Sequence, residues 1–403
     1  MITRVKRFFR SRGVRKLLAN RLALVALAII ALYVSVAVAI TLFGVIDVDA
    51  TAERVGTDTY PAFFLEQEPE KRFKDADFWL SAVDRGLTRH SDPERQQQSL
   101  NDIHFAERHV AKVSLAELTE RVDTAWTYFE ELEEYEDLNA DIAENPEILT
   151  ILDQLEEAVA ALYQPLSGLE KFRYQTRLVL GTDRAGRSIS IRATYSIKVA
   201  IQVGMITSLI SVAIGALLGA AAGFFGGWID NLVIWLYSTF SSIPNLVLLT
   251  VLAYMFTGTR FDGTLVPVYV AFCSTFWIGP CRVIRGETLK LKELEYVQAA
   301  TSIGFHRLTI LVKHIIPNTS HLMFINFSLL FIGAIKSEVI LTFLGLGVKD
   351  GASWGIMIAY SGQEVVNGHF WQIGAATVFM FGLVLAFNIL SDALQDAFDP
   401  KHV

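Results

Sequence analysis

The chain has 403 residues, of which 52% are hydrophobic and only 19% are charged. This balance is too apolar for an ordinary soluble protein and indicates a protein of the lipid bilayer. The formal net charge of -7 hides an uneven distribution, because residues 1–46 carry eight Lys and Arg and no acid, whereas residues 47–190 carry 31 acids against 15 bases. The bases flank apolar runs and are not interleaved with aromatic residues, which argues against nucleic acid as a partner.

Six charge-free runs are long enough to cross a hydrocarbon core of about 30 Å, which requires about 20 helical residues. The first run is too long for a signal peptide, and we interpret it as an uncleaved span. The sequence therefore predicts an all-α polytopic membrane protein with six transmembrane helices. The six runs are residues 22–46, 199–229, 231–259, 263–281, 314–335 and 365–391.

The positions of Lys and Arg orient these spans. If the N-terminus is cytoplasmic, residues 1–21, residues 282–313 and the C-terminal tail hold 15 of them, whereas the short outer loops hold only Arg260, Lys336 and Lys349. We therefore expect both termini in the cytoplasm. The long segment from residue 47 to about residue 198 is then extracytoplasmic, and a domain of this length crosses largely regardless of its charge.

Three glycines in the second span, Gly215, Gly219 and Gly223, recur at intervals of four residues. This spacing places them on one helix face, where the absence of side chains lets another helix approach closely. We interpret the face as a contact inside one helical bundle, with a homodimer contact as the alternative.

The third span contains Pro244 near its middle, directly after Ser241, Ser242 and Ile243. A proline within a helix frees a backbone carbonyl and kinks the helix. In a transporter such a kink can bend the wall of a pathway, whereas in another membrane protein it can simply be tolerated. The sequence favours neither interpretation of Pro244 over the other.

Residues 47–177 have the composition of a soluble domain. Ser114 and Glu117 have the spacing of a capping box, and Asn145 with Pro146 marks a second helix start. Apolar residues follow both starts at steps of three and four, which predicts two amphipathic helices and, in the simplest arrangement, an antiparallel hairpin. Between Arg121 and Lys171 there are 14 acids and no base, as on a solvated face or on a docking surface for a basic partner.

Several catalytic and nucleotide-binding patterns are missing from the sequence. There is no Gly-Lys pair, so the chain has no phosphate-binding loop for ATP, and there is no His-Glu-x-x-His zinc motif. Gly351, Ser353 and Gly355 match the nucleophile elbow of hydrolases, but a short loop between two spans cannot supply the sheet that such an elbow requires. We therefore expect no enzyme activity and no bound cofactor or metal in this chain.

A short helix is expected at about residues 291–304, on the cytoplasmic side. It contains Glu295, Tyr296 and Gln298 together with three small residues, Ala299, Ala300 and Gly304. Small residues on one side would let the surface of another protein approach the backbone, and the neighbouring bases would pair with its acids. Taken alone, the same pattern also fits an ordinary surface helix.

The segment is followed by His314-Ile315-Ile316-Pro317-Asn318, and the whole closely resembles the Glu-Ala-Ala, three residues, Gly signature of the permease subunits of ATP-binding-cassette (ABC) importers, including the interval from Gly304 to Pro317. The resemblance covers residues 181–400 and is closest to the C-type permeases of the oligopeptide, dipeptide and nickel importers. Further matches are Gly181-Thr182-Asp183, Gly186-Arg187, Gly226-Gly227-Trp228-Ile229-Asp230, Arg282, Arg285-Gly286-Glu287, Ser337-Glu338, Phe343-Leu344-Gly345-Leu346-Gly347, Ser353-Trp354-Gly355, Asn388 and Asp396-Ala397-Phe398-Asp399-Pro400.

The sequence departs from the family pattern at a few places. Gln298 stands where the signature has Glu, Ser188 stands where the family usually has Asp, and residues 391–393 replace a Gly-Asp-Gly-like run. The insertion at 47–177 is far longer than the linker common in the family, so the resemblance implies no role for it.

The resemblance implies a type I permease fold in residues 178–395, between the first span and a short tail at 396–403. It also implies a second, homologous permease, two ATPase subunits that bind ATP and magnesium in the cytoplasm, and an extracytoplasmic solute-binding protein. In the family the segment from Glu295 to Gly304 is the coupling helix, which sits in a groove of the ATPase. The coupling role is carried over to Glu295, Tyr296, Gln298, Ala299, Ala300 and Gly304, with Pro317 setting the angle of the fifth span.

Peptides are the first expectation for the cargo, a nickel or other metal chelate is the second, and export rather than import is the third. A membrane sensor or scaffold is the alternative from another class. A sensor normally carries a cytoplasmic output domain after its last span, and only about ten residues follow Asp392. The sequence therefore favours the permease.

Overall fold

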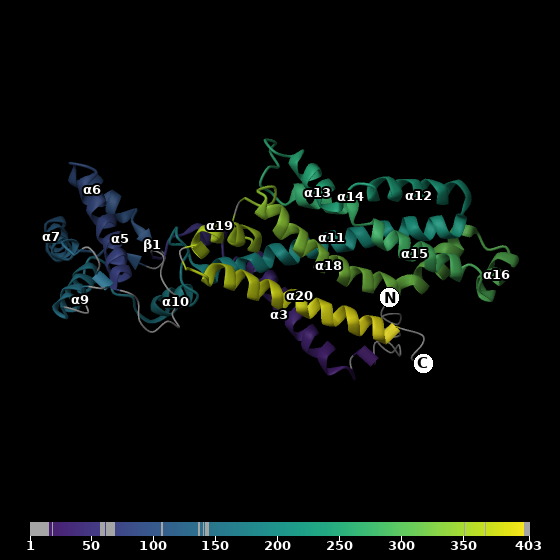
Figure 1. The fold of residues 1–403 in the computed structure, drawn as a ribbon, viewed down its shortest axis with the longest axis horizontal. Helices are drawn as coiled ribbons and strands as arrows, with labels where there is room; N and C mark the ends of the chain where they lie inside the picture. The colour runs from purple at the N-terminus through teal and green to yellow at the C-terminus, as the bar shows by residue number, and fades with distance from the viewer. Residues whose placement is uncertain are drawn as a thin grey trace. The chain divides into compact units, whose positions relative to one another are not determined.

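The computed structural model describes residues 16–17, 19–56, 61, 69–105, 108–135, 138–139, 141, 145–349, 351–366 and 368–398. Helices dominate this part of the chain (Figure 1). The strands β1 (His104–Phe105) and β2 (Arg108–His109) pair as a small antiparallel ribbon. The all-α fold class is therefore confirmed.

The chain divides into two compact units. The bundle unit comprises Met1–Val45, Thr194–Tyr360 and Ala376–Val403, and the insertion unit comprises Ile46–Ala193 and Ser361–Ala375. Two long helices, α11 (Ile189–Phe225) and α20 (Trp371–Phe398), contribute residues to both units.

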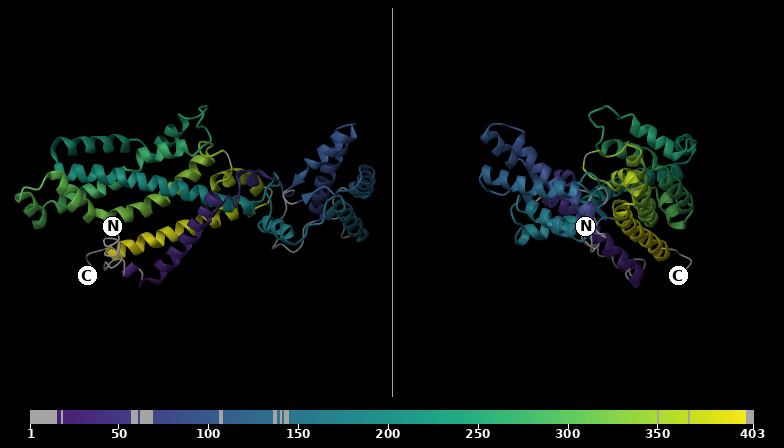
Figure 2. Two further views of the ribbon diagram at one scale, coloured as in Figure 1. Left: turned by 180° about the vertical axis from the view of Figure 1, so that it is seen from behind. Right: turned by 60° about the vertical axis from the view of Figure 1, so that its left-hand side comes forward.

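Five helical stretches of the described chain are long and apolar enough to cross a membrane, and a bent helix pair brings the number to six. Within the bundle unit, α11, α15 and α18 run alongside one another (Figures 1 and 2). The stretches are α3 (Arg21–Phe43), α11, α14 (Val266–Thr275) with α15 (Ile278–Leu291), Arg307–Phe343 with α18 (Ser320–Phe343), and α20, and the bent pair is α12 (Gly227–Ser241) with α13 (Asn245–Tyr254).

Each predicted apolar run falls largely within one of these stretches. The helices extend beyond the charge-free runs where charged side chains find partners. Thus α11 begins at Ile189, before the run at 199–229, because Arg192 in its first turn forms a buried ion pair with Asp183. The first span ends at a glycine. Gly44 adopts a left-handed conformation (φ 59°) directly after the last residue of α3.

The third span is broken at the position of Pro244. The helix α12 ends at Ser241, α13 begins at Asn245, and the two are bent by 85°. Pro244 has no N–H to continue the hydrogen-bond ladder of α12, and it occupies the cap position of α13. The structure thus contains a sharp bend here, while a role of Pro244 in a transport pathway stays a prediction.

The insertion unit is a helical domain with its own core. Its two predicted helices are present as α7 (Leu115–Glu133) and α9 (Glu147–Ala160), and they pack against each other. The hydroxyl of Ser114 accepts a hydrogen bond from the Glu117 amide (3.2 Å) as predicted, whereas the Glu117 carboxylate accepts one from Arg121 (2.6 Å). Among the described residues this unit also contains α4 (Val48–Ala52), α5 (Pro69–Thr88), α6 (Pro93–Asn101), α10 (Gly168–Leu178) and the end of α19 (Trp354–Val366).

The helix α5 was not predicted, although it packs against both α7 and α9. Its buried residues Ala76, Leu80, Val83 and Leu87 lie in the same core cluster as those of the hairpin. Arg72 of α5 pairs with Asp153 (2.5 Å) and Glu156 (2.8 Å) of α9, and the hydrogen bond to Glu156 raises the pKa of the Arg72 guanidinium. Part of the acidic run is therefore neutralised inside the domain by a base from outside that run.

Candidate functional site

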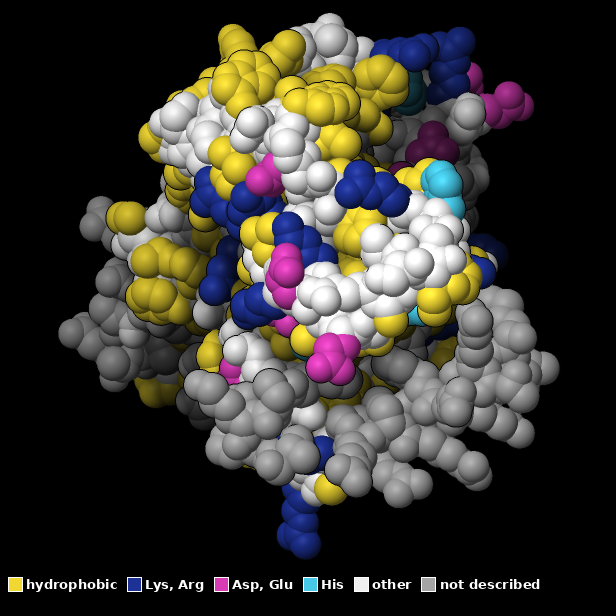
Figure 3. Space-filling view, turned by 90° about the vertical axis from the view of Figure 1, so that its right-hand side faces the viewer, with side chains coloured by type: hydrophobic (Ala, Val, Ile, Leu, Met, Phe, Trp, Pro, Cys, Tyr) yellow, Lys and Arg dark blue, Asp and Glu magenta, His cyan; other side chains and the backbone are white. Residues whose placement is uncertain are grey.

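The predicted coupling segment contains the short helix α16 (Glu295–Ser302), which follows α15 and precedes α17 (Arg307–Ile310). One face of α16 is held against the bundle. Val297 and Ala300 are buried there, in a cluster with Ile310, Ile315 and Ala216. Figure 3 shows the molecule from the side on which α16 lies, and apolar, basic and acidic side chains lie next to one another on this surface.

The other face of α16 is exposed. It carries Glu295, Tyr296, Gln298 and Ala299. Apolar side chains continue this surface beyond the helix, with Ile303 77% exposed and Phe305 and Leu308 each about half exposed. We call this surface the α16 face, and define it as Glu295, Tyr296, Gln298, Ala299, Ile303, Phe305 and Leu308.

Ala300 differs from the expectation for the small residues. Its side chain is only 6% exposed and packs inside the bundle unit. The reason is helical periodicity, because Ala300 lies three residues after Val297 and so shares its buried face. Ala299 is thus the alanine of the pair that offers a small side chain to the surface.

Gly304 is explained by the backbone. Its φ of +88° is left-handed, and the Gly304 N–H donates to the Thr301 carbonyl (3.0 Å) while the Phe305 N–H donates to the Ala300 carbonyl (3.1 Å). This is a Schellman cap, which favours glycine. A Cβ at Gly304 would meet nothing within 4 Å, so inside this chain the conformation, not crowding, explains the glycine.

Side chains of α16 also bond to their surroundings. The Gln298 amide donates to the Glu293 carbonyl (3.1 Å), a bond that a carboxylate at this position cannot make. Asn318 donates both to the Tyr296 hydroxyl (2.9 Å) and to the His314 carbonyl (2.6 Å). The exposed helix is thereby linked to the segment that leads into α18.

That segment contains a joint at Pro317. The π-helix η1 (Leu311–Ile315) and the 3-10 helix η2 (Ile316–Thr319) connect α17 to α18. Pro317 lies in the first turn of η2, and the wide π turn before it lets the Ile316 N–H reach the Leu311 carbonyl. The joint supports the expectation that Pro317 sets the angle of the fifth span, which stays a prediction.

The glycines of α11 face α15 of the same chain. A Cβ at Gly215 would lie 2.6 Å from the Trp277 carbonyl oxygen, and one at Gly223 would lie 2.8 Å from the Arg285 carbonyl oxygen. A Cβ at Gly219 would approach the backbone of the same helix. The geometry thus favours packing inside the bundle over a homodimer contact.

We expect Gly215→Ala to destabilise the protein by about 1–3 kcal/mol, because the added methyl group overpacks a helix contact. Gly286→Ala in α15 is the matched control, since a Cβ there meets nothing within 4 Å. The control should be neutral or slightly stabilising, as alanine is the better helix former. Thermal unfolding in detergent measures both variants, and equal unfolding temperatures would contradict the packing role.

Polar contacts between the spans complete the site. Arg285 donates two hydrogen bonds to Asp230 of α12 (2.5 and 2.7 Å), and Arg282 donates one to Ser241 (2.8 Å). Within α18 itself, the buried Glu338 accepts a hydrogen bond from Thr342, four residues further along the helix (2.8 Å). From the sequence, Arg282, Arg285 and Asp230 were only matches to family motifs, and their contacts depend on the tertiary fold.

The fold and this site define a polytopic membrane protein with an exposed helix tied to one of its spans. Comparison with known proteins supports this description of the chain as a polytopic membrane protein. The family described as "Binding-protein-dependent transport system inner membrane component" matches residues 215–402, which include α16 and the Pro317 joint.

Several characterised proteins are similar to the chain. It is 35% identical over 222 residues to the dipeptide transport system permease protein DppC of Bacillus subtilis (strain 168), covering 55% of this chain and 68% of that protein. It is 34% identical to the oligopeptide transport system permease protein OppC of Haemophilus influenzae, covering 55% and 70%. It is 32% identical to the glutathione transport system permease protein GsiD of Pectobacterium atrosepticum, covering 55% and 72%.

The chain belongs to this family of inner membrane transport components. It is an integral inner membrane protein and the permease subunit of an ABC importer, which works together with other transporter components.

Proposed function

We propose that the chain forms one half of a path through which peptides cross the inner membrane, with a second, homologous permease forming the other half. The observation that carries the proposal is the α16 face, an exposed apolar surface on a helix that is bonded to the start of a span. The relatives named for dipeptide, oligopeptide and glutathione transport support peptides as the cargo. A nickel or other metal chelate is the alternative cargo.

In this proposal two separate ATPase subunits engage the α16 face and supply ATP and magnesium, so the chain itself needs no cofactor. Apolar side chains such as Ile303, Phe305 and Leu308 stabilise a complex when they are removed from water. The Tyr296–Asn318 hydrogen bond and the Pro317 joint would pass a displacement of α16 to α18. A rigid-body movement of this kind suits the alternating states of a transporter.

We further propose that both termini lie in the cytoplasm, on the side where the bases are concentrated. The segment from residue 47 to about residue 198 is then extracytoplasmic, where a solute-binding protein would deliver the cargo. The insertion unit has its own core, consistent with a domain that folds outside the membrane.

Uptake by the reconstituted transporter tests the proposed cargo. Proteoliposomes that contain both permeases, the ATPases and the binding protein are given a radiolabelled tripeptide or a nickel chelate, with and without ATP. We expect ATP-dependent uptake of the tripeptide, and none when this chain is left out. Uptake of the chelate but not of the peptide would contradict peptide as cargo.

We expect the purified chain alone to show no ATP turnover above the rate of empty detergent micelles, because it lacks a phosphate-binding loop. Phosphate release is the measurement, and the same preparation with added ATPase subunits is the positive control. ATP hydrolysis by the chain without its partners would show that it has an ATPase site of its own. This result would contradict the proposal that separate subunits hydrolyse the ATP.

A further inference from the structure

A pocket of about 690 Å³ lies in the insertion unit, where the chain leaves α9 and enters α10. This volume is in the range typical of sites for small ligands. Aromatic rings form much of its wall, and a cation lies among them. The lining includes Arg108, Tyr163, Lys171, Phe172 and Tyr174.

Arg108 is held in place by aromatic rings. Its guanidinium carbon lies 4.8 Å from the ring centre of Trp79, 5.0 Å from that of Tyr174 and 6.0 Å from that of Tyr163. The hydroxyl of Tyr163 donates to the Trp79 carbonyl (2.8 Å), and that of Tyr174 donates to the Val55 carbonyl (3.1 Å). The rings are therefore fixed, and they orient the guanidinium before any ligand arrives.

The backbone that carries Arg108 is fixed as well. The Gln164 N–H donates to the His109 carbonyl (2.9 Å), and the Ala111 N–H donates to the Leu162 carbonyl (2.8 Å). The strand β2 is thus bonded to the chain that leaves α9, on the wall of the pocket. A site whose parts are already in place loses little conformational entropy on binding.

Arg108 differs from other arginines of the insertion unit in its ion pairing. Arg72, Arg121 and Arg177 of the same unit each pair with a carboxylate. Within the described part of the chain, no carboxylate lies within ion-pair distance of Arg108, even though the insertion is rich in acids. A guanidinium presents N–H donors in a planar fork that matches the two oxygens of a carboxylate.

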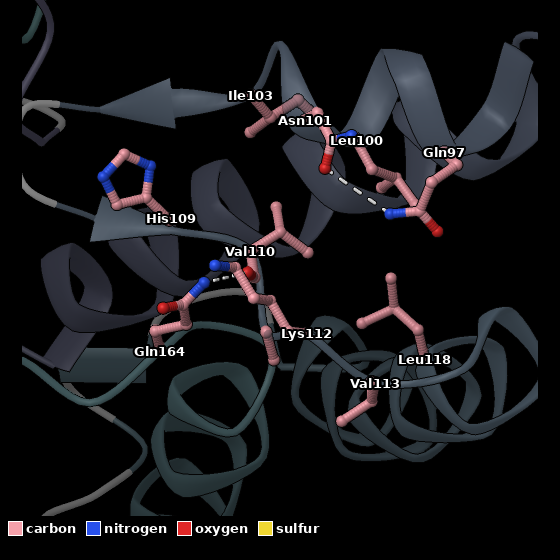
Figure 4. A pocket seen from close by; sticks show the side chains of 11 residues that line it. Gln97, Leu100, Asn101, Ile103, His109, Val110, Lys112, Val113, Leu118 and Gln164 are labelled. Carbon is pink, nitrogen blue, oxygen red and sulfur yellow. Dashed lines mark hydrogen bonds between the residues drawn. The ribbon is translucent and has the colours of Figure 1, made fainter.

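A second, smaller pocket of the insertion unit, of about 210 Å³, serves as a comparison for the Arg108 pocket (Figure 4). Its two glutamines bond within the domain, since Gln164 donates to the Val110 carbonyl (3.0 Å) and Gln97 donates to Asn101 (3.5 Å). Both glutamine side chains are thus already engaged, and the volume of this pocket is below the usual range for ligand sites.

We propose that the larger pocket binds the C-terminal end of a short peptide, with the terminal carboxylate on Arg108 and the last, apolar side chain against Phe172 and the neighbouring wall. The inference rests on the proposed function in taking peptides as the cargo. Phe172 is 63% exposed, so an apolar side chain can reach it from solution. The insertion would then hold a peptide on the extracytoplasmic side.

The test uses the full chain in lipid nanodiscs and a fluorescently labelled tripeptide of two alanines and a C-terminal phenylalanine. Fluorescence anisotropy compares the free acid with its C-terminal amide. We expect the amide to bind at least about tenfold more weakly, because the charge that Arg108 recognises is gone. Arg108→Gln should weaken binding of the acid to a similar extent.

Arg95→Gln is the matched control, because Arg95 is an exposed arginine of the same unit outside the pocket, and it should leave the affinity unchanged. Phe172→Ser removes part of the wall at an exposed position, so it should fold and bind the acid several-fold more weakly. It keeps the test valid if Arg108→Gln fails to fold.

Equal binding of acid and amide, or full binding by both folded pocket variants, would overturn the inference. Displacement of the probe by 3-phenylpropionate as readily as by the unlabelled tripeptide would also overturn it, since the pocket would then recognise simple aryl acids. Peptide uptake by proteoliposomes without binding at Arg108 refutes this inference alone. Binding at Arg108 without peptide uptake supports the pocket and contradicts the proposed cargo.

Discussion

Replacing Ala299 by tryptophan is expected to reduce ATP-driven uptake at least tenfold while the protein still inserts into the membrane. Ala299 lies on the exposed side of α16, and its backbone is helical, so the larger side chain adds volume without straining this chain. Overpacking a contact typically costs about 1–3 kcal/mol, and about 1.4 kcal/mol corresponds to a factor of ten. The measurement is uptake of labelled peptide by proteoliposomes at matched protein content.

The control is Ala116→Trp, the same exchange at an exposed position of α7 in the insertion unit, which should leave uptake unchanged. Gly304 is a less suitable position, because any larger residue there must adopt a left-handed backbone. Normal uptake by the Ala299 variant would mean that no protein surface closes over this side of α16.

Replacing Arg285 by methionine should destabilise the bundle unit by about 3 kcal/mol, the lower end of the range for breaking a buried ion pair. The variant leaves the half-buried carboxylate of Asp230 without its two hydrogen bonds from Arg285. We expect the lower end of this range because the side chains of Arg285 and Asp230 are each still about a fifth exposed to solvent. Thermal unfolding in detergent is the measurement.

The double variant Asp230→Asn with Arg285→Met tests the cause, because it removes both charges and should recover most of the lost stability. Arg282→Met is a second comparison, since Arg282 bonds to the neutral Ser241 and stacks on Tyr237, and it should cost less. A single Arg285 variant as stable as the parent would show that the pair adds nothing to the joining of α12 and α15.

The membrane helices were predictable because their signal is strong. Long charge-free runs have few alternatives in a folded chain, and each run coincides with an apolar helical stretch. Pro244 marked the bend between α12 and α13, since proline cannot donate the hydrogen bond that a continuous helix needs. The size of the bend depends on packing, which the sequence does not display.

The insertion was predicted only in part, for a physical reason. The hairpin helices α7 and α9 carry clear starts and a regular apolar period. The helix α5 interleaves Lys71, Arg72 and Lys74 with its apolar positions, which weakens the same signal. The spacing of Ala76, Leu80, Val83 and Leu87 was nevertheless visible, and it would have identified the buried face.

The coupling residues were expected from the resemblance alone, which did not show what each of them does inside this chain. Ala300 proved to be buried and Gly304 to cap the helix, because face and backbone angle follow from where α16 begins and ends. The Tyr296–Asn318 and Asp230–Arg285 bonds join residues far apart in the sequence. Such contacts become visible only once the chain is folded.

We propose that a separate ATPase engages the chain at the α16 face, and site-specific cross-linking tests this contact most directly. Cys273 and Cys281 are replaced by alanine, and one cysteine is introduced as Ala299→Cys or, as the control, as Ala116→Cys in α7. We expect a short bifunctional reagent to join position 299, but not position 116, to an ATPase subunit of the assembled transporter. Cross-links at position 116 only, or at neither position in a transporter that still imports peptide, would contradict it.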